Sequence, residues 1–216
     1  MAKISSDSSR CGDRPEVGID GWQALFDGRT TGGWRGYRRG TIPDGWYADD
    51  GVFRREGKGG DLMTVEQFAD FELYLEWRLE PGGNSGIILR VSEKGEKSWH
   101  SGPEMQILDD EAHQPGLKPK NACGALYNLV PVPEGVSSII GEWNSVRIVV
   151  RGSSYRFWLN GIQTVDLDLA SPEGQRLIAA SKFGKFPGFG KEARGHIVLQ
   201  DHGDKVEFRH VLIREL

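Results

Sequence analysis

Residues 71–79, FELYLEWRL, constrain the fold of this chain more than any other stretch. Every odd position carries a large apolar side chain, and the even positions carry Glu72, Tyr74, Glu76 and Arg78. An alternation with period two is typical of a strand that buries one of its faces. A second layer therefore has to cover that face, while the polar face points away from the core.

Turn signals divide most of the remaining chain into short strands. Asp50–Gly51 and Asn160–Gly161 predict tight hairpins, and PGGNSG at 81–86 predicts a turn that pairs residues 86–91 antiparallel with 71–79. Further strands are predicted at 61–65, 99–110, 143–151, 155–166, 196–199 and 206–215, and a helix only at 171–180. This pattern predicts an all-β fold, an antiparallel β-sandwich with one short helix.

Length and composition favour one domain. The chain has 216 residues, with 30 Gly and seven Trp, which suits a sandwich with many tight turns. Residues 1–17 are rich in Ser, Asp and Gly and are expected to be a flexible tail, with a single domain at 18–216. Cys11 and Cys123 are too few for a disulfide framework, so they form one bridge or stay as thiols.

Charge narrows the class of partner. A net charge of −4 offers no broad attraction for nucleic acid or an anionic membrane, so a small-molecule or oligosaccharide ligand is expected. No stretch is apolar enough for a membrane span or a secretory signal. The protein is therefore expected in the periplasm or outside the cell if an export signal was removed, and otherwise in the cytoplasm. Its oligomeric state stays open.

The strand within 99–110, WHSGPEMQILDD, carries the first candidate for chemistry. Alternation from Pro103 places Glu104 and Gln106 on one face, with Cα atoms roughly 6.6 Å apart. Two such neighbours can contact one small ligand. The same sequence pattern also fits an exposed strand face whose two polar residues are only solvated. Ionisable and aromatic residues at both ends of this strand favour a functional site.

Several stretches in order resemble one known family. They include GWQALFDGRTTGGW, FELYLEWRLEPGGNSGIILRV, GPEMQILDDEAH, CGALYNLV, GEWNSVRIVVRG, FWLNGIQTVDLDL and SKFGKFPGFGKEARGHIVLQDHGDKVEFRHVLIREL. From residue 19 to residue 216 the chain is similar to the 3-keto-disaccharide hydrolases, a mostly bacterial family associated with concanavalin A-like jelly rolls. The resemblance implies cleavage of a glycoside already oxidised at C3.

Such a substrate has its own chemistry. A ketone at C3 acidifies the C2 proton, so a base can remove it and the C1 substituent leaves by elimination before water adds. This route needs a base at C2, donors at O3 and an acid for the leaving group. Two alternatives stay open: a carbohydrate-binding module without catalysis, and a laminarinase-like hydrolase of unoxidised glucans. The ionisable cluster favours an enzyme.

The expected catalytic residues are Glu104 as base or acid, His202 as a proton shuttle and Lys182 as a donor to the enolate oxygen. His202 is favoured because QDHG recurs in the family's pattern. The expected substrate-binding residues are Arg90, Gln106, Asp109, Tyr127, Trp143 and Trp34. No cofactor is expected, and no metal, because Asp109 and His113 form no compact ligand motif with Glu104 or His202. Glu104, Gln106, Arg90 and His202 should share one cleft, beneath a flexible flap at 184–191.

Overall fold

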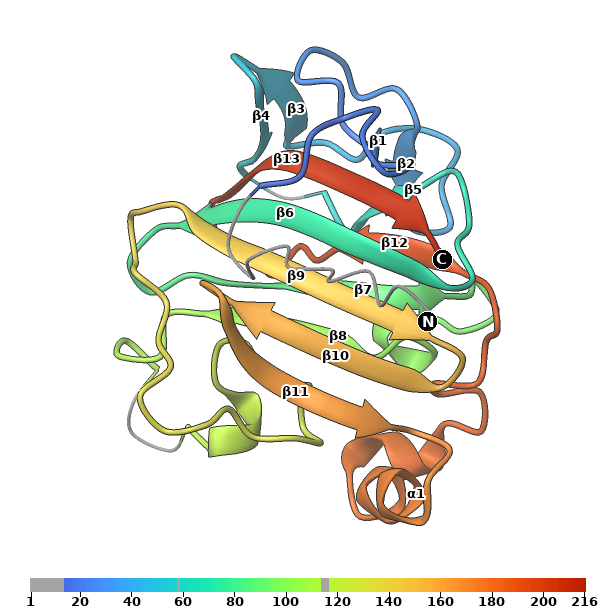
Figure 1. Cartoon of the computed structure of the whole chain (residues 1–216). Helices are drawn as coiled ribbons and strands as arrows, with labels where there is room; N and C mark the ends of the chain where they lie inside the picture. The colour runs from blue at the N-terminus through green and yellow to red at the C-terminus, as the bar shows by residue number, and fades with distance from the viewer. Residues whose placement is uncertain (1–13, 58, 114–116) are drawn as a thin grey trace, which may run out of the picture.

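The computed structural model of this chain describes residues 14–57, 59–113 and 117–216, and strands dominate these ranges. Eight strands form one sheet and five form the other, and the two sheets stack face to face (Figure 1). Each strand pairing in the described ranges is antiparallel. The predicted antiparallel sandwich with one short helix is confirmed.

The eight-stranded sheet has the order β11-β10-β9-β6-β13-β4-β3, with β1 added beside β13. Its strands are β1 (Gln23–Ala24), β3 (Trp46–Asp49), β4 (Val52–Arg55), β6 (Phe71–Leu79), β9 (Asn144–Arg151), β10 (Ser154–Leu159), β11 (Ile162–Asp168) and β13 (Val206–Glu215). The strand β13 therefore lies in the interior of the sheet, between β6 and β4, although it is the last strand in the sequence.

The five-stranded sheet has the order β2-β5-β12-β7-β8. Its strands are β2 (Trp34–Gly36), β5 (Leu62–Thr64), β7 (Asn84–Val91), β8 (Glu104–Leu108) and β12 (His196–Leu199). The helix α1 (Pro172–Ala179) lies at one end of the sandwich (Figure 1), and single 3-10 turns occur at η1 (Ser98–His100), η2 (Pro119–Asn121) and η3 (Lys182–Lys185). Ser171 caps α1 by accepting a hydrogen bond from Gly174 N.

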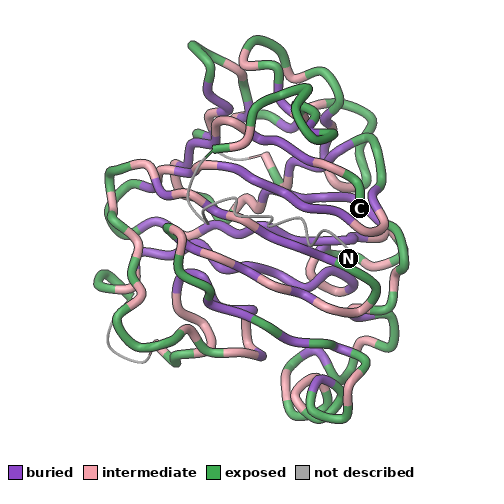
Figure 2. The backbone as a smooth tube through the Cα atoms, viewed as in Figure 1, coloured by how far each residue is buried: buried purple, intermediate pink, exposed green. Residues whose placement is uncertain are grey.

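The core fills the space between the sheets. Phe71, Leu73, Leu75, Trp77 and Leu79 all belong to it, as their alternation predicts. Figure 2 shows that burial follows the strands, whereas the connecting loops are mostly exposed. Apolar burial of this kind is the main favourable contribution to folding.

The hairpin predictions agree with the structure except in one case. Asp50 and Gly51, and likewise Asn160 and Gly161, have positive φ angles, as a two-residue hairpin turn requires. The predicted pairing of residues 71–79 with 86–91 is wrong, because β6 and β7 lie in different sheets. The 81–86 turn carries the chain from one layer to the other.

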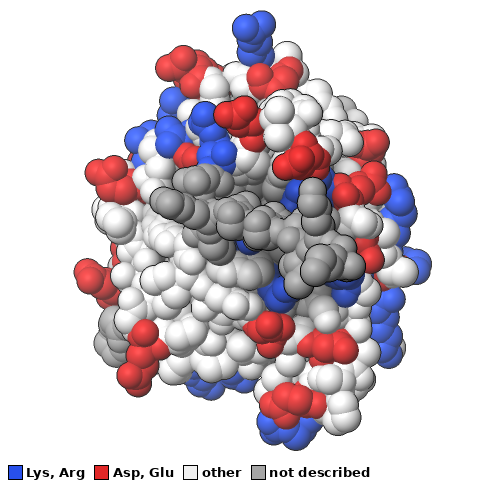
Figure 3. Space-filling view, viewed as in Figure 1, with Lys and Arg blue, Asp and Glu red and all other residues white. Residues whose placement is uncertain are grey.

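The predicted N-terminal tail lies mostly outside the described residues, which begin at Arg14; that arginine donates a hydrogen bond to His210. Cys11 also lies outside them, and Cys123 is buried. No helix in the described ranges is long and apolar enough to cross a membrane. On the face seen in Figure 3, acidic and basic side chains are interspersed.

Candidate functional site

The register of the five-stranded sheet aligns residues that are far apart in the sequence. Leu62 pairs with Leu199, Leu199 with Ile87, and Ile87 with Met105, and all four side chains face the core. The residue next to each of these points to the opposite face of the sheet. The outer face therefore carries a second row, made of the residue adjacent to each of these four in the sequence, all at the same edge of the core row.

That second row is polar. Its members are Asp61, Gln200, Gly86 and Gln106, and Tyr37 extends it past β5 by donating its backbone N–H to Asp61 O. Gln200 N donates to Gly86 O, which fixes the position of Gln200 beside β7. We call Tyr37, Asp61, Gln200 and Gln106, with the gap at Gly86, the polar row.

Glu104 fills the gap in the polar row. Glu104 pairs with Ile88, two residues after Gly86 on β7, and its side chain reaches back over Gly86. A Cβ atom at Gly86 would stand 2.1 Å from Glu104 Oε1, so only glycine leaves room for this carboxyl. The carboxyl of Glu104 therefore lies in the polar row, beside Gln200.

The Glu104 carboxyl is buried and incompletely paired. Its residue is 3% exposed, and Oε1 accepts no hydrogen bond from the part of the chain that the structure describes. Burial raises the pKa of Glu104 to about 8; the charge of Asp61 adds to the rise, while the Lys182 ammonium and Gln200 oppose it. At neutral pH this group is a carboxylic acid with a proton to give.

Lys182 and Tyr127 lie near Glu104, and Tyr127 N donates to Glu104 O. The Lys182 Nζ lies 4.5 Å from the Trp99 ring centre and 4.4 Å from that of Tyr127. Burial lowers the pKa of Lys182, and Glu104 opposes this. Both Lys182, a predicted catalytic residue, and Tyr127, a predicted substrate contact, thus lie near Glu104.

The 184–191 segment is packed rather than loose. Phe183 and Phe189 are buried and stack with ring centres 4.1 Å apart, and Phe186 stacks on His100. Gly190 N also donates to Ser101 O. These contacts hold η3, and with it Lys182, in place.

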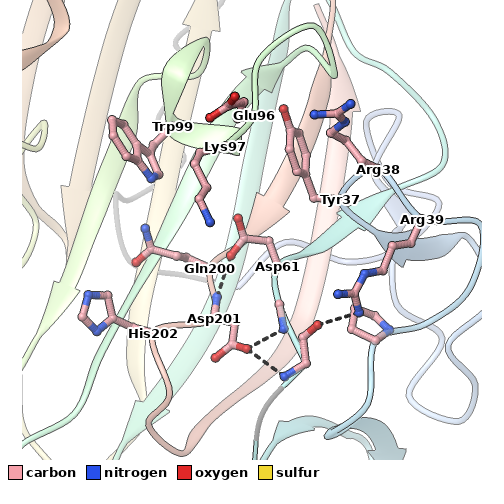
Figure 4. A pocket seen from close by; sticks show the side chains of 13 residues that line it. Tyr37, Arg38, Arg39, Asp61, Glu96, Lys97, Trp99, Gln200, Asp201 and His202 are labelled. Carbon is pink, nitrogen blue, oxygen red and sulfur yellow. Dashed lines mark hydrogen bonds between the residues drawn. The ribbon is translucent and has the colours of Figure 1, made fainter.

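A pocket of about 510 Å³ opens over the other half of the polar row (Figure 4). It is lined by Tyr37, Arg38, Arg39, Pro43, Gly59, Gly60, Asp61, Glu96, Lys97, Trp99, Gln200, Asp201 and His202. This volume is within the range of pockets that bind small ligands. Glu104 does not line the pocket itself, but Gln200, which does, hydrogen-bonds to the Glu104 carboxyl. Trp99 both lines the pocket and contacts Lys182.

Asp61, Glu96 and Asp201 are the carboxylates that line this pocket, and the sequence predicted none of them as site residues. Ser98 Oγ donates to Oδ2 of Asp61, and Asp201 N donates to its Oδ1. The pKa of Asp61 is raised overall: burial is the largest cause and the charge of Asp201 adds to it, whereas these two hydrogen bonds and the nearby Lys97 ammonium oppose the rise. In the sequence, Asp61 only follows a glycine-rich turn, and no periodicity places it near Glu104.

Residues 21–214 match the family described as the 3-keto-alpha-glucoside-1,2-lyase-like domain. The chain belongs to this family. A 3-keto-disaccharide hydrolase of Bacteroides thetaiotaomicron is 32% identical over 232 residues, which cover 93% of this chain and 80% of that protein. The predicted family is thereby confirmed, and with it the predicted enzyme class, a hydrolase.

Solved structures agree with the family. A candidate glycosyl hydrolase of Parabacteroides distasonis superposes with a TM-score of 0.84 at 30% identity, covering 91% of this chain and 94% of that chain. A second one from the same organism gives a TM-score of 0.67 at 29% identity, covering 85% and 99%. The sandwich is thus shared over almost the whole of both chains.

The remaining site predictions for this member of the 3-keto-alpha-glucoside-1,2-lyase-like family divide into two groups. Gln106 lies in the polar row, where its Nε2 is 3.4 Å from Asn84 Oδ1, and His202 lies exposed at the pocket rim. Of the predicted site residues, His202 alone lines this pocket, and Arg90, Asp109, Trp34 and Trp143 lie outside both the pocket and the polar row. Each of these four residues makes structural contacts elsewhere in the fold.

Arg90 is the clearest correction, because it was expected in one cleft with Glu104. Between the pairs His196–Val91 and Val198–Ile88, β7 contains one residue more than β12, which is a β-bulge, and Arg90 has a φ angle of 47°. The bulge breaks the alternation and turns the guanidinium away from the polar row. It donates instead to Ala69 O, Gly152 O and Asp70 Oδ1, joining β7 to the other sheet.

We expect Arg90→Met to destabilise the fold by about 2–4 kcal/mol, because the buried Arg90 guanidinium would no longer bond Ala69 O, Gly152 O and Asp70 Oδ1. Urea denaturation measures this difference. Arg151→Met, at an exposed strand end, is the matched control and should stay within about 0.5 kcal/mol of the wild type. Equal stability of both variants would contradict a structural role for Arg90.

The other three residues are also placed differently from the prediction. Trp34 is a core residue: its Nε1 donates to Leu25 O and its ring packs edge-on against Phe53. Trp143 lies between the guanidinium groups of Arg78 and Arg209, on strands of the other sheet.

Asp109 accepts hydrogen bonds from Gly82 N and Ala112 N, which hold its pKa below the usual value. Its carboxylate fastens the turn that follows β8. The described residues contain no group of three or more His, Cys, Asp or Glu side chains that could hold a metal ion.

Proposed function

We propose that this chain cleaves 3-keto-glycosides by elimination at C1–C2 followed by addition of water. The observation that carries the proposal is the buried, proton-holding carboxyl of Glu104 beside a ligand-sized pocket. Two printed descriptions support it. The family is described as 1,2-lyase-like, and the Bacteroides relative is named a hydrolase of 3-keto-disaccharides. Elimination is a lyase reaction, and elimination followed by hydration amounts to hydrolysis, so one route fits both descriptions.

Glu104 is the acid in this proposal. A carboxyl with a pKa of about 8 is protonated at neutral pH and can therefore protonate the departing oxygen at C1. The C1–O bond breaks as the enolate electrons form the C1=C2 double bond. In other enzymes, one buried neutral carboxylic acid serves as the acid while a second, ionised carboxylate has the complementary role at the same pH.

Cationic side chains stand at both ends of the site. Lys97 lines the pocket near Asp61, and Lys182 lies near Glu104. An ammonium group that faces the C3 carbonyl stabilises the negative charge that develops on O3 when the C2 proton leaves. Lys97 is the better placed of the two for O3, because Lys182 lies at the end where the leaving group departs.

The proposal is tested with 3-keto-trehalose and 3-keto-sucrose, each compared with its unoxidised parent sugar. We expect cleavage of the keto sugars only, since the parents have no acidic C2 proton. In D₂O the product should carry deuterium at C2 at early times, above the level that the keto sugar acquires in enzyme-free buffer. Cleavage of the parents at a similar rate would instead indicate a conventional glucanase. Binding without cleavage would indicate a carbohydrate-binding module.

A further inference from the structure

The polar row contains a second carboxylate that the proposed elimination needs. Asp61 directly precedes β5, Gln200 directly follows the neighbouring strand β12, and the Glu104 carboxyl stands over Gly86 on β7, beyond β12. Two strand spacings separate their positions by roughly 10 Å. A single sugar ring therefore fits over Gln200 with one carboxyl on each side.

The surroundings of Asp61 keep it fixed and open to the pocket. Ser98 Oγ and Asp201 N each occupy one lone pair of its carboxylate, which leaves further acceptor positions toward the cavity that Asp61 lines. Figure 4 shows Lys97 and Gln200 pointing into the same space. Burial raises the pKa of Asp61 above its usual value, although the two hydrogen bonds and the Lys97 ammonium oppose the rise, and a carboxylate with a raised pKa is a stronger base.

The other candidates are less suited. Asp201 has its carboxylate taken up by Gly59 N, Gly60 N, Gly203 N and the Arg55 guanidinium. His202 is exposed at the rim. Lys182 does not line the pocket, and its ammonium lies against the rings of Trp99 and Tyr127.

We infer that Asp61 is the base that removes the C2 proton of the keto sugar. The inference rests on the proposed function. The Asp61 carboxylate takes the proton from C2, and the C–H electrons form the enolate on O3. The enolate then expels the C1 oxygen, which leaves with the proton of Glu104. Water adds to C1 of the resulting enone, giving its proton to the Glu104 carboxylate, and C2 regains a proton from Asp61. The sum is hydrolysis.

The test separates proton removal from bond cleavage. The probe is 1,5-anhydroglucitol oxidised to the ketone at C3, which has a C2 proton but no exocyclic leaving group at C1. In D₂O the wild type should exchange the C2 proton of this probe faster than enzyme-free buffer does, as followed by NMR. Asp61→Asn should lower this exchange by about 10²–10⁴-fold, because an amide cannot take the proton.

Asp61→Asn is a conservative change, since the amide can still accept from Asp201 N and donate to Ser98 Oγ. Asp61→Ser is the second variant, for which the same loss is expected. Glu66→Gln, which removes an exposed carboxylate just beyond the other end of β5, is the matched control. Glu104→Gln should lower exchange far less than it lowers cleavage of a keto disaccharide.

The outcomes distinguish the two proposals. If the wild type neither exchanges the probe nor cleaves keto sugars, the proposed function fails. If the wild type does both and folded Asp61→Asn exchanges at the wild-type rate, Asp61 is not the base. Loss of exchange in His202→Asn, with Asp61→Asn active, would assign the base to His202 and likewise overturn the inference.

Discussion

Replacing Glu104 with Gln is expected to lower kcat for cleavage of a 3-keto-disaccharide by about 10²–10⁴-fold. Gln keeps the size of the side chain but cannot give a proton to the departing sugar. Glu104 is neutral at neutral pH because burial raises its pKa to about 8, so the neutral replacement should leave the fold and substrate binding nearly intact. Steady-state kinetics measure kcat and KM, and a thermal melt measures the stability of the fold.

The leaving group and the pH provide the controls for this variant. A 3-keto-glucoside of 4-nitrophenol needs little protonation, so Glu104→Gln should slow its cleavage much less than that of the disaccharide. For the disaccharide, kcat/KM of the wild type should fall as the pH rises above about 8, since the acid is then ionised. Equal losses on both substrates would contradict the role of Glu104 as the acid.

Gly86→Ala is expected to lower cleavage by about 10²-fold or more, although residue 86 carries no functional group. The new methyl carbon would stand 2.1 Å from Glu104 Oε1 and 3.0 Å from Cδ, so the carboxyl has to move out of the polar row. Because the displaced atoms are the end of a flexible side chain, the melting temperature should change little. Kinetics on a 3-keto-disaccharide and a thermal melt check the two statements.

Two further variants show whether Gly86 acts through Glu104. In Gly86→Ala/Glu104→Gln the losses should not add, because the displaced acid is already absent. Gly40→Ala is the matched control, since a Cβ there would meet no atom within 4 Å. Additive losses in the double variant would mean that Gly86 affects the site by another path.

Local patterns in the sequence predict the elements well but not their neighbours. Alternation places β6 correctly, and Asn160–Gly161 places a hairpin. The 81–86 turn was wrongly assigned as a hairpin, because Gly and Pro specify a chain reversal but not the sheet that the next strand joins. Which layer receives a strand depends on long-range packing that no local signal encodes.

The candidate site shows the same limit. Alternation within one strand brings Glu104 and Gln106 to a common face, as the structure has them. Asp61 joins them only through the pairing of β5 with β12, of β12 with β7 and of β7 with β8, which involves four segments that are distant in the sequence. Arg90 departs from its expected face because of a single extra residue in β7, and such a bulge leaves no periodic signal.

The interior position of β13 has a consequence for how this protein reaches its fold. The strands β6 and β4 flank β13, yet more than half of the chain separates β4 from it in sequence. Until β13 has been synthesised, both flanking strands present unpaired backbone edges, which can capture other chains. Closing such long loops before their contacts form also slows folding. We therefore expect a slow folder that depends on protection from aggregation during synthesis, with the polar row assembled only at the end.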